Sequence, residues 1–325
     1  MTLPRVTIGL PTFNRAPSLY TSISLILNQT FKDFELLIYD DGSSDSTIEI
    51  VESFSDNRIS FYNFPNQGPP FPLNFILDHA NGEYIIFLHD HDYFSEDLIE
   101  KCVNALDKDK TSGFVLPGGI TIPENNEMIQ NPELLPNELD YKNSGKFFLL
   151  KTFTQRKSFE SKFHACSMVR RTALDKVGKY YNTKYGFYSD VELWLRLLHD
   201  FDFIYLHEPL IQFTTREKDH VLTGKEIEVL NNLFSIHFDT IHECFYEDQD
   251  FYINILKKKY FTEAFWLIAN LSSYKDTNID GLIKKIPKKN IDGKLRLFLL
   301  GLFKLRIIRI VSNAIKRAIK FISKN

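Results

Sequence analysis

The sequence predicts an α/β protein whose mostly parallel sheet is flanked by helices. Strand-like and helical segments alternate through the first third of the chain, the pattern of strands joined by helical crossovers. The unbroken apolar run at 84–88 indicates a strand that is buried on both faces. An apolar content of 43%, with 14% aromatic residues, is enough for a large core and excludes general disorder.

The predicted elements of the amino-terminal part rest on local signals. The segment 6–10 is β-rich, and apolar residues recur at helical spacing from Leu19 to Leu27. The loop at 40–47 is rich in Asp and Ser, which cap helices. We expect strands at 6–10, 34–39, 59–62, 84–88 and near 113–116, and helices at 16–28, 48–54, 73–79 and 96–107.

The sequence of the second half of the chain indicates further strands and helices and a division of the protein into two domains. Residues 117–144 are rich in Pro, Asn and Glu, which predicts irregular surface loops. Gly178 is typical of a residue that ends a helix. We divide the chain into a domain over 1–221 and a helical extension over 222–325. Strands are expected at 163–170 and 210–215, and helices at 171–177, from 189 onward, at 224–244 and at 251–271.

Two polar clusters directly follow predicted strands. Asp40 and Asp41 end one strand, and four metal-capable side chains at 89–92 end another. The carboxyl ends of parallel strands meet at one edge of a sheet, where ligands of open α/β sheets bind. Carboxylates and imidazoles are suitable ligands for Mg²⁺ or Mn²⁺, and such an ion could clamp a diphosphate. The alternative is a solvated acidic turn that caps the next helix.

Asp190 stands in the first turn of a predicted helix. The N-terminus of a helix stabilises an ionised carboxylate. An ionised carboxylate at the mouth of a site can act as a general base, although an ordinary helix-start Asp is the simpler alternative. Glu192 and Arg196 lie one helical turn apart on the same helix and can pair with each other.

Composition excludes several classes of protein. The three cysteines, Cys102, Cys166 and Cys244, are odd in number and widely spaced, which disfavours a disulfide framework and fits a reducing cytoplasm. We find neither a secretion signal nor an apolar run long enough to span a membrane. No Gly-x-Gly-x-x-Gly follows the first strand, so a dinucleotide oxidoreductase is poorly supported.

The carboxyl-terminal segment 282–325 is strongly basic. It has thirteen Lys or Arg and one acid, a net charge of +12; because the whole chain carries −3, the preceding 281 residues carry −15. From Arg306 onward the basic residues share one side of a predicted helix and isoleucines the other, which is typical of a helix lying on an anionic membrane. Docking on the acidic body, pairing in a homodimer and nucleic-acid binding are the alternatives; we expect no nucleic-acid partner.

The ordered set of motifs resembles family 2 glycosyltransferases of the GT-A fold, over about residues 4–215. No single motif is decisive, but the order is specific. The motifs are Pro11-Thr12-Phe13-Asn14-Arg15, Asn28-Gln29-Thr30, Asp40-Asp41-Gly42-Ser43, Asn66-Gln67-Gly68 with Asn74, Gly82-Glu83-Tyr84, the acidic strand end at 90–92, and Ser189-Asp190 with 193–196.

The resemblance implies a nucleotide-sugar site and an inverting reaction. Pro11 and Phe13 match positions that line the base, and Asp41 matches the acid that hydrogen-bonds it. Asp190 matches the general base that deprotonates the acceptor hydroxyl. The donor-binding residues that the resemblance implies are Pro11, Thr12, Phe13, Asn14, Arg15, Asp41, Asn74 and Asp90.

The resemblance also implies a divalent cation, Mn²⁺ or Mg²⁺, held by Asp90, His91 and Asp92. The family usually has an acid where His91 stands, and that acid is the usual metal ligand. Imidazole can ligate Mn²⁺, so the site can use a different ligand set, bind metal weakly or bind none. His220, beyond the last predicted strand, is a possible further ligand.

We therefore predict an inverting glycosyltransferase that moves a sugar from a nucleoside-diphosphate donor, a UDP-sugar, to a hydroxyl of a lipid-linked or surface glycan. Its expected location is cytoplasmic, peripheral on the inner face of the cell membrane. One alternative is a catalytically silent nucleotide-binding or scaffold homologue, which His91 makes credible. Another is a processive polysaccharide synthase, disfavoured because no Gln-x-x-Arg-Trp motif or membrane span is present.

Overall fold

The structure, a computed structural model, describes residues 3–123, 141–154, 166–215, 226–244 and 249–271. The chain forms two compact units, Met1–Thr152 with Ser158–His220, and Phe153–Lys157 with Val221–Asn325. The predicted amphipathic helix from Arg306 onward and the possible ligand His220 lie outside the described residues.

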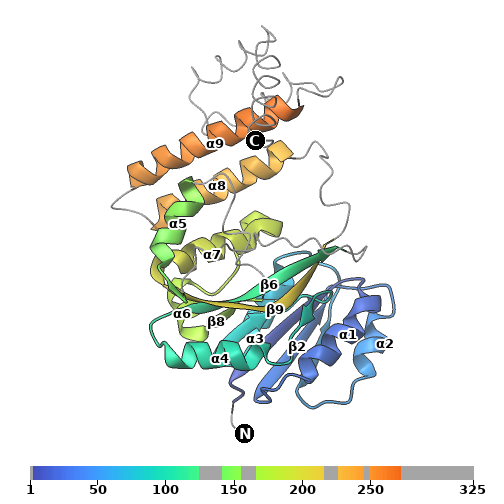
Figure 1. The fold of residues 1–325 in the computed structure, drawn as a ribbon. Coiled ribbons are helices and arrows are strands. Elements are labelled where there is room, and N and C mark those ends of the chain that lie inside the picture. Colours follow the sequence, from blue (N-terminus) through green and yellow to red (C-terminus); the bar gives the residue numbers. More distant parts are fainter. Residues whose placement is uncertain (1–2, 124–140, 155–165, 216–225, 245–248, 272–325) are drawn as a thin grey trace, which may run out of the picture. The chain divides into compact units, whose positions relative to one another are not determined.

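The first unit is built on one nine-stranded sheet (Figure 1). Its strands follow the spatial order β3-β2-β1-β4-β8-β6-β9-β5, and β7 also pairs with β9. The strands are β1 (Val6–Thr12), β2 (Phe34–Asp40), β3 (Ile59–Asn63), β4 (Tyr84–Phe87), β5 (Tyr93–Phe94), β6 (Phe114–Pro123), β7 (Lys142–Asn143), β8 (Met168–Arg170) and β9 (Phe203–Thr215).

The sheet has a parallel half and a mixed half. Strands β3, β2, β1 and β4 are parallel neighbours, as predicted from the alternation of strands and helices. Strand β8 is antiparallel to both β4 and β6, while β6 and β9 are parallel. The short strands β5 and β7 run antiparallel to β9. The prediction of an α/β fold on a sheet flanked by helices is confirmed.

Helices cover both faces of this sheet (Figure 1). Along β2 the side chains alternate between faces, because successive residues of a strand point to opposite sides. Leu36 and Ile38 lie in the same buried cluster as residues of the helices α1 (Ala16–Leu27) and α4 (Leu98–Lys108). Leu37 and Tyr39 pack against Ile76 of the helix α3 (Phe71–His79). The helices of this unit are α1 (Ala16–Leu27), α2 (Thr47–Glu52), α3 (Phe71–His79), α4 (Leu98–Lys108), α5 (Gly145–Thr154), α6 (Arg171–Val177) and α7 (Ser189–Asp200), with a 3₁₀ segment at Thr183–Tyr188.

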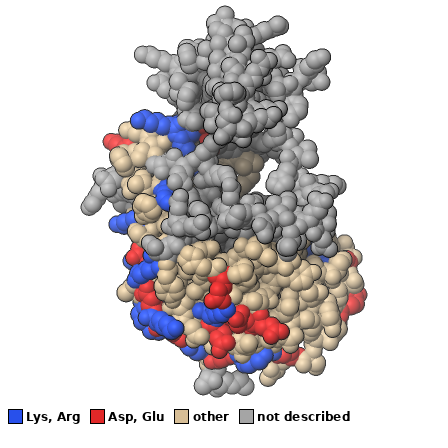
Figure 2. Space-filling model, viewed as in Figure 1, with Lys and Arg blue, Asp and Glu red and all other residues tan. Residues whose placement is uncertain are grey.

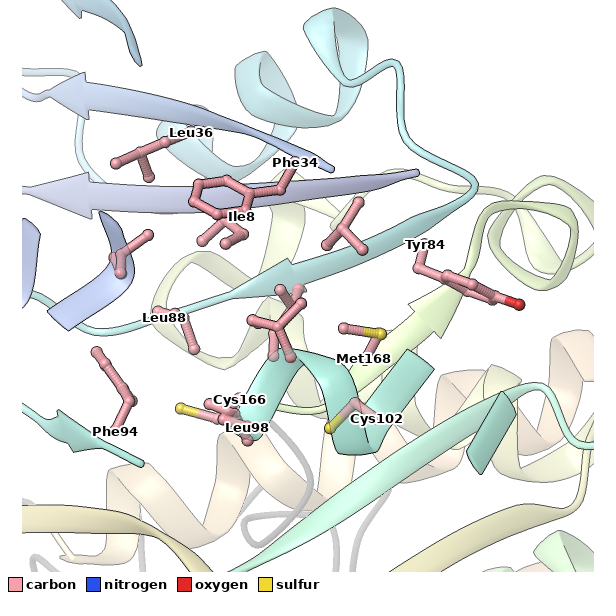
Figure 3. Packing of buried hydrophobic residues seen from close by; sticks show 14 of the residues in the cluster. Ile8, Phe34, Leu36, Tyr84, Leu88, Phe94, Leu98, Cys102, Cys166 and Met168 are labelled. Atoms are coloured by element: carbon pink, nitrogen blue, oxygen red, sulfur yellow. The ribbon is translucent and has the colours of Figure 1, made fainter. Parts of the chain in front are cut away.

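The main core lies between α1, α4 and the strands beneath them (Figure 3). Tyr84 and Leu88, at the two ends of the predicted apolar strand, are both fully buried. The two cysteines that the structure describes there, Cys102 and Cys166, are free and buried, and burial raises the pKa of both thiols. They therefore act as small apolar side chains of the core.

Aromatic side chains pack α5 and α7 against β6 and β9. The Phe114 and Phe203 rings stack with centroids 5.2 Å apart, and Trp194 of α7 lies 5.3 Å from Phe114. Val191 and Leu195 are buried, so the predicted apolar face of α7 is confirmed. This packing fixes the first turn of α7, which carries Asp190.

The prediction of irregular loops over 117–144 was wrong for residues 117–123, which continue β6. Ten residues of β6 pair in parallel with β9, and register shifts at Gly118 and Gly119 absorb the irregular backbone. Pairing with a distant strand thus outweighs the local Pro and Gly signals. Residues 163–165 of the strand expected at 163–170 lie outside the described residues; β8 begins at Met168, and Cys166 before it has a φ of 64°, outside the extended region.

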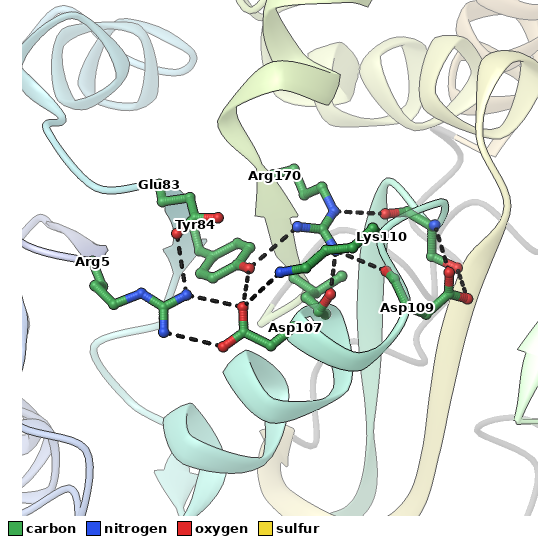
Figure 4. Close-up of polar contacts among 9 residues, drawn as sticks. Arg5, Glu83, Tyr84, Asp107, Asp109, Lys110 and Arg170 are labelled. Atoms are coloured by element: carbon green, nitrogen blue, oxygen red, sulfur yellow. Dashed lines mark hydrogen bonds and ion pairs between the residues drawn. The ribbon is translucent and has the colours of Figure 1, made fainter.

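A polar network joins the amino-terminal ends of β1 and β4 to α4 (Figure 4). Arg5 donates to both carboxylate oxygens of Asp107, at 3.0 and 2.9 Å, and the Tyr84 hydroxyl donates to Asp107 at 2.8 Å. The hydrogen bonds from Arg5 hold the pKa of Asp107 well below its usual range. The network lies at the amino-terminal ends of the strands, whereas the two predicted polar clusters follow their carboxyl ends.

We expect Asp107→Asn to lower the free energy of unfolding by about 1–2 kcal/mol at pH 7, because Arg5 would lose an ionised partner that water partly screens. A carboxylate whose pKa is depressed in the folded state stabilises the protein above its unfolded pKa. The difference between wild type and variant should therefore persist from pH 7 to 5 and shrink as the pH falls below about 4. Urea unfolding at several pH values measures it. A difference that grows on acidification would contradict this account.

The second unit contains α8 (Glu226–Cys244) and α9 (Gln249–Leu271), as the helical periodicity predicted. The two helices pack through aromatic residues, with the Phe234 and Tyr260 rings 4.5 Å apart, and both side chains are buried. Among the helices that the structure describes, none is long and apolar enough to cross a membrane.

Acidic and basic side chains are interspersed on the described part of the face shown in Figure 2. The described residues on that face therefore do not form a single acidic field.

Candidate active site

The carboxyl ends of β1, β2 and β4 bring the two predicted polar clusters to one edge of the sheet. Thr12, the last residue of β1, lies opposite Asp40, the last residue of β2, in the parallel register. The Thr12 hydroxyl donates to Asp90 Oδ2 at 2.8 Å, and both side chains are buried. The prediction that the clusters share one edge is confirmed.

Asp41 holds the loop that follows β3. Its carboxylate accepts hydrogen bonds from the backbone N–H groups of Gln67, at 2.8 Å, and Gly68, at 2.9 Å. Gly42 has a φ of +78°, and a Cβ there would lie 2.7 Å from the Asn66 nitrogen. Two motifs far apart in sequence thus form one turn, which only glycine at 42 permits.

The loop after β1 is fastened to the loop after β2. Asn14, with a φ of 52°, accepts from the Ser44 N–H at 2.8 Å and donates its own N–H to the Ser43 hydroxyl at 2.8 Å. Phe13 is 46% exposed, and Pro11 and Arg15 are partly exposed. These hydrogen bonds hold the backbone of the loop after β1, so that Pro11, Phe13 and Arg15 lie at the edge of the sheet.

Asp90 holds His91 at the strand end. The Asp90 Oδ1 lies 2.9 Å from His91 Nδ1, so both carboxylate oxygens of Asp90 are engaged by Thr12 and His91. The hydrogen bond with Asp90 raises the pKa of His91, and the charges of Asp92 and Asp90 act in the same direction. Burial and the charge of Arg15 oppose that rise.

Asp92 joins the cluster to β9. One carboxylate oxygen accepts from the Thr214 N–H at 2.9 Å, and the other lies 2.9 Å from His89 Nδ1. The imidazole rings of His89 and His91 are nearly parallel, with centroids 5.3 Å apart. His89 is one of the four metal-capable side chains recognised at 89–92 in the sequence, but it was not among the predicted metal ligands Asp90, His91 and Asp92.

Among the residues that the structure describes, one group could hold a metal ion: His89, His91 and Asp92. Each offers one ligand atom, and these atoms lie within 4.8 Å of one another. Two imidazole nitrogens and a carboxylate oxygen are ordinary ligands for a divalent cation, so the residues present fit the implied cofactor. Asp90 is not a member of this group.

The predicted residue Asn74 is hydrogen-bonded to the backbone of Tyr181. The Asn74 side chain makes two hydrogen bonds with the Tyr181 backbone, at 3.0 and 2.8 Å. Burial raises the pKa of Tyr181, and the charge of Asp190 acts in the same direction. The Tyr181 ring contacts Phe87, the last residue of β4, with centroids 6.0 Å apart. Asp190 lies in the first turn of α7 and is partly exposed.

Gln29 and the pair Glu192 and Arg196 make contacts within the fold. Gln29 is fully buried, donates to the Ser95 carbonyl at 2.7 Å and accepts from the Ile99 N–H at 3.1 Å, so it fixes the start of α4. Glu192 and Arg196 form the predicted pair, with an N–O distance of 2.7 Å.

We expect Thr12→Val to destabilise the protein by about 1–3 kcal/mol, because the nearly isosteric valine leaves a buried Asp90 oxygen without its hydroxyl donor. Thermal or urea unfolding checks the loss, and Thr12→Ser, which keeps the hydroxyl, is the matched control. Equal losses in the two variants would show that packing of the methyl group, rather than the hydrogen bond, is responsible.

Comparison with known proteins gives the family. The model of glycosyl transferase family 2 matches residues 7–178, just over half of the chain. A glucosyltransferase of Campylobacter jejuni, named for its substrate GalNAc(5)-diNAcBac-PP-undecaprenol, is 29% identical over 228 residues, covering 68% of each protein. Chondroitin synthase of Pasteurella multocida is 25% identical over 87% of this chain, but the match spans only 30% of that enzyme. An uncharacterized Haemophilus influenzae glycosyltransferase is 37% identical over 33% of this chain and 44% of that protein.

Solved structures show the same fold. The crystal structure of S. aureus TarS 1-349 superposes with a TM-score of 0.65 at 16% identity, over 97% of this chain and 92% of that one. The complex of the same protein with UDP-GlcNAc gives a TM-score of 0.62 at 18% identity, with the same coverage. The sheet, the strand-end site and the family match lead to one conclusion: the chain belongs to glycosyl transferase family 2, and it is a glycosyltransferase of the GT-A fold.

Proposed function

We propose that the protein transfers a sugar, with inversion at the anomeric carbon, from a UDP-sugar to a hydroxyl of a lipid-linked or surface glycan. Residues 1–221 form the catalytic domain in this proposal, and residues 222–325 form an extension that meets the membrane. The glucosyltransferase of C. jejuni is named for an acceptor linked to undecaprenol, and TarS, which has the same fold, was crystallised with UDP and with UDP-GlcNAc.

The donor lies at the carboxyl ends of β1, β2 and β4 in this proposal. The partly exposed Pro11, the exposed Phe13 and the carboxylate of Asp41 contact the base. Arg15, a partly exposed residue of the loop that follows β1, would contact the diphosphate in this proposal. A guanidinium suits this role because it remains charged and donates to phosphate oxygens.

The chemistry requires a base for the acceptor and stabilisation of the leaving group. Asp190 takes the proton from the acceptor hydroxyl as that oxygen attacks the anomeric carbon. The bond from the anomeric carbon to the diphosphate breaks in the same displacement, so the nucleoside diphosphate leaves from the opposite face. A bound divalent cation supplies charge stabilisation to the departing diphosphate. His89, His91 and Asp92 would hold that cation, and no covalent intermediate is needed.

The observation that carries this proposal is the hydrogen bond from the Thr12 hydroxyl to Asp90, which joins the carboxyl ends of β1 and β4 at one polar edge of the sheet. On that edge the loop held by Asp41 and the histidine cluster lie on either side of the loop at 13–15. In this proposal the partly exposed side chains of the loop at 13–15 contact the base, and Arg15 and the bound cation would neutralise the phosphates.

Calorimetric titration of UDP-, GDP- and dTDP-sugars, with and without Mn²⁺, tests the proposal on the full chain. We expect one UDP-sugar to bind with an affinity that Mn²⁺ increases, and we expect His91→Ala to lose that increase. Slow hydrolysis of the bound donor would show that the site is reactive. Failure of every donor to bind to the folded protein, or a preference for GDP or dTDP, would overturn the proposed donor class.

We also propose that the basic segment 282–325 attaches the enzyme to the inner face of the membrane, which would bring it to a lipid-linked acceptor. Each basic residue near an anionic surface contributes about 1 kcal/mol. When the full chain is sedimented with vesicles that contain roughly 30 mol% anionic lipid, it should pellet with the vesicles at low salt and stay in the supernatant at high salt. A full chain that stays in the supernatant at low salt would contradict this.

A further inference from the structure

We propose that Asn74 and Arg196 are positioning residues for the transfer reaction: together they hold the segment 177–181, which leads into α7, and so fix the place of Asp190. This inference rests on the proposed function, in which Asp190 is the base, and it adds residues that act through that base. It gives Asn74 a role other than the donor contact that the resemblance implied.

The side-chain amide of Asn74 is engaged by the chain itself. Asn74 lies near the start of α3, and its Nδ2 donates to the Tyr181 carbonyl at 3.0 Å. Its Oδ1 accepts from the Tyr181 N–H at 2.8 Å. Tyr181 is buried, and a buried backbone group without a partner destabilises a fold. One amide thus satisfies both backbone groups of Tyr181 and ties the segment 177–181 to α3.

The guanidinium of Arg196 ties the same segment to α7. It donates to the carbonyls of Val177, Gly178 and Tyr180, the last at 3.0 Å. It also donates to both carboxylate oxygens of Glu192, at 2.7 and 2.8 Å, one turn earlier on the same helix. The Arg196 and Glu192 side chains are only 15% and 5% exposed, so these hydrogen bonds are largely shielded from water and are electrostatically stronger for it. Because the planar guanidinium fixes the directions of its donors, Arg196 holds these three carbonyls against α7.

The two sets of contacts join the start of α7 to the sheet. They fall on adjacent residues, Tyr180 and Tyr181. Helix α3 is fixed to the sheet, because its Ile76 packs in one buried cluster with side chains of β2. After Tyr181 the chain continues through the 3₁₀ segment into α7, whose first turn contains Asp190. A misplacement of about 1 Å in a reacting group can cost about 100-fold in rate, so loss of either contact set should slow the reaction.

Asn74→Ala in the full chain separates a positioning role from donor binding. Two quantities are measured with Mn²⁺ present: the affinity for UDP by calorimetry, and the rate of UDP release from a saturating UDP-sugar. We expect the release rate to fall about 10–100-fold while the affinity for UDP stays within about twofold of the wild type. A donor ligand would give the opposite pattern, with UDP bound more weakly and a smaller change in the release rate.

Arg196→Lys is the second variant, and it guards against lost folding. Lysine keeps a positive charge beside the buried Glu192 but lacks the planar fork that reaches the three carbonyls. It should slow UDP release with little change in the affinity for UDP. Because both replacements free the same segment, the double variant should lose less than the product of the two single losses.

Asn81→Ala is the matched control for Asn74→Ala. The Asn81 amide donates to Glu35 and to the His79 carbonyl, both at 3.1 Å, and makes no contact with the segment 177–181. Its loss should leave both the release rate and the affinity for UDP unchanged. Circular dichroism verifies that every variant is folded.

Hydrogen exchange of the peptide 177–188, measured without any ligand, tests the contacts independently of activity. We expect Asn74→Ala and Arg196→Lys to speed exchange in this peptide about tenfold, while exchange in β1 and β2 stays the same. Unchanged exchange, a wild-type release rate in Asn74→Ala, or weakened UDP binding as its main effect would overturn the inference. A wild type that neither binds UDP nor releases it would refute the proposed function instead, and faster exchange in the variants would still show that the two residues hold the segment.

Discussion

Asp190→Asn is expected to lower kcat about 1,000-fold, within the range that general-base catalysis contributes, while donor affinity stays near that of the wild type. Asparagine keeps the size of the side chain and can fill the same place in the first turn of α7. It cannot accept the proton of the acceptor hydroxyl at neutral pH. Transfer rates at saturating donor and acceptor measure the loss, and donor titration measures the affinity.

Asp175→Asn is the matched control for Asp190→Asn, because Asp175 is an exposed carboxylate on the neighbouring helix α6. It should leave both kcat and donor affinity unchanged. If Asp190→Asn keeps more than about a tenth of the wild-type rate, Asp190 is not the base, since general-base catalysis is typically worth at least 100-fold. The residue would then be an ordinary helix-start acid.

Arg170→Met is expected to cost about 3 kcal/mol of stability, the largest effect that we expect outside the site. The guanidinium of Arg170 donates to the Ser112 and Asp109 carbonyls, at 2.9 and 2.8 Å, and to the Tyr84 hydroxyl at 3.2 Å (Figure 4). It also donates to the carbonyl of Leu106. Methionine keeps much of the length of the side chain but removes every donor, so these partly buried acceptors lose their partner.

Urea unfolding followed by circular dichroism measures the effect of Arg170→Met. Lys176→Met is the control, because the Lys176 side chain is 58% exposed and lies 3.5 Å from its acidic partner. A loss below about 1 kcal/mol, the usual value of an exposed ion pair, would show that water replaces the guanidinium at those carbonyls.

Much of the fold was predictable because the pattern of local hydrophobicity is strong. The parallel half of the sheet has short strands of consecutive apolar residues joined by amphipathic helices, and β1, β2 and β4 were predicted within one or two residues. The antiparallel insertion of β8 and the continuation of β6 through Pro123 were not. Both depend on pairing with strands distant in sequence, which local composition does not report.

The candidate site divides in the same way. The sequence alone determined that Asp90, His91 and Asp92 end a strand and that Asp190 begins a helix, because these facts follow from local periodicity and chain order. Only the tertiary structure decided which polar atoms meet. Thr12 reaches Asp90, Asn74 reaches Tyr181 and Asp92 reaches β9 across long separations in sequence. These contacts could not be predicted from the sequence, because hydrogen-bond partners are set by the folding of distant strands onto one edge.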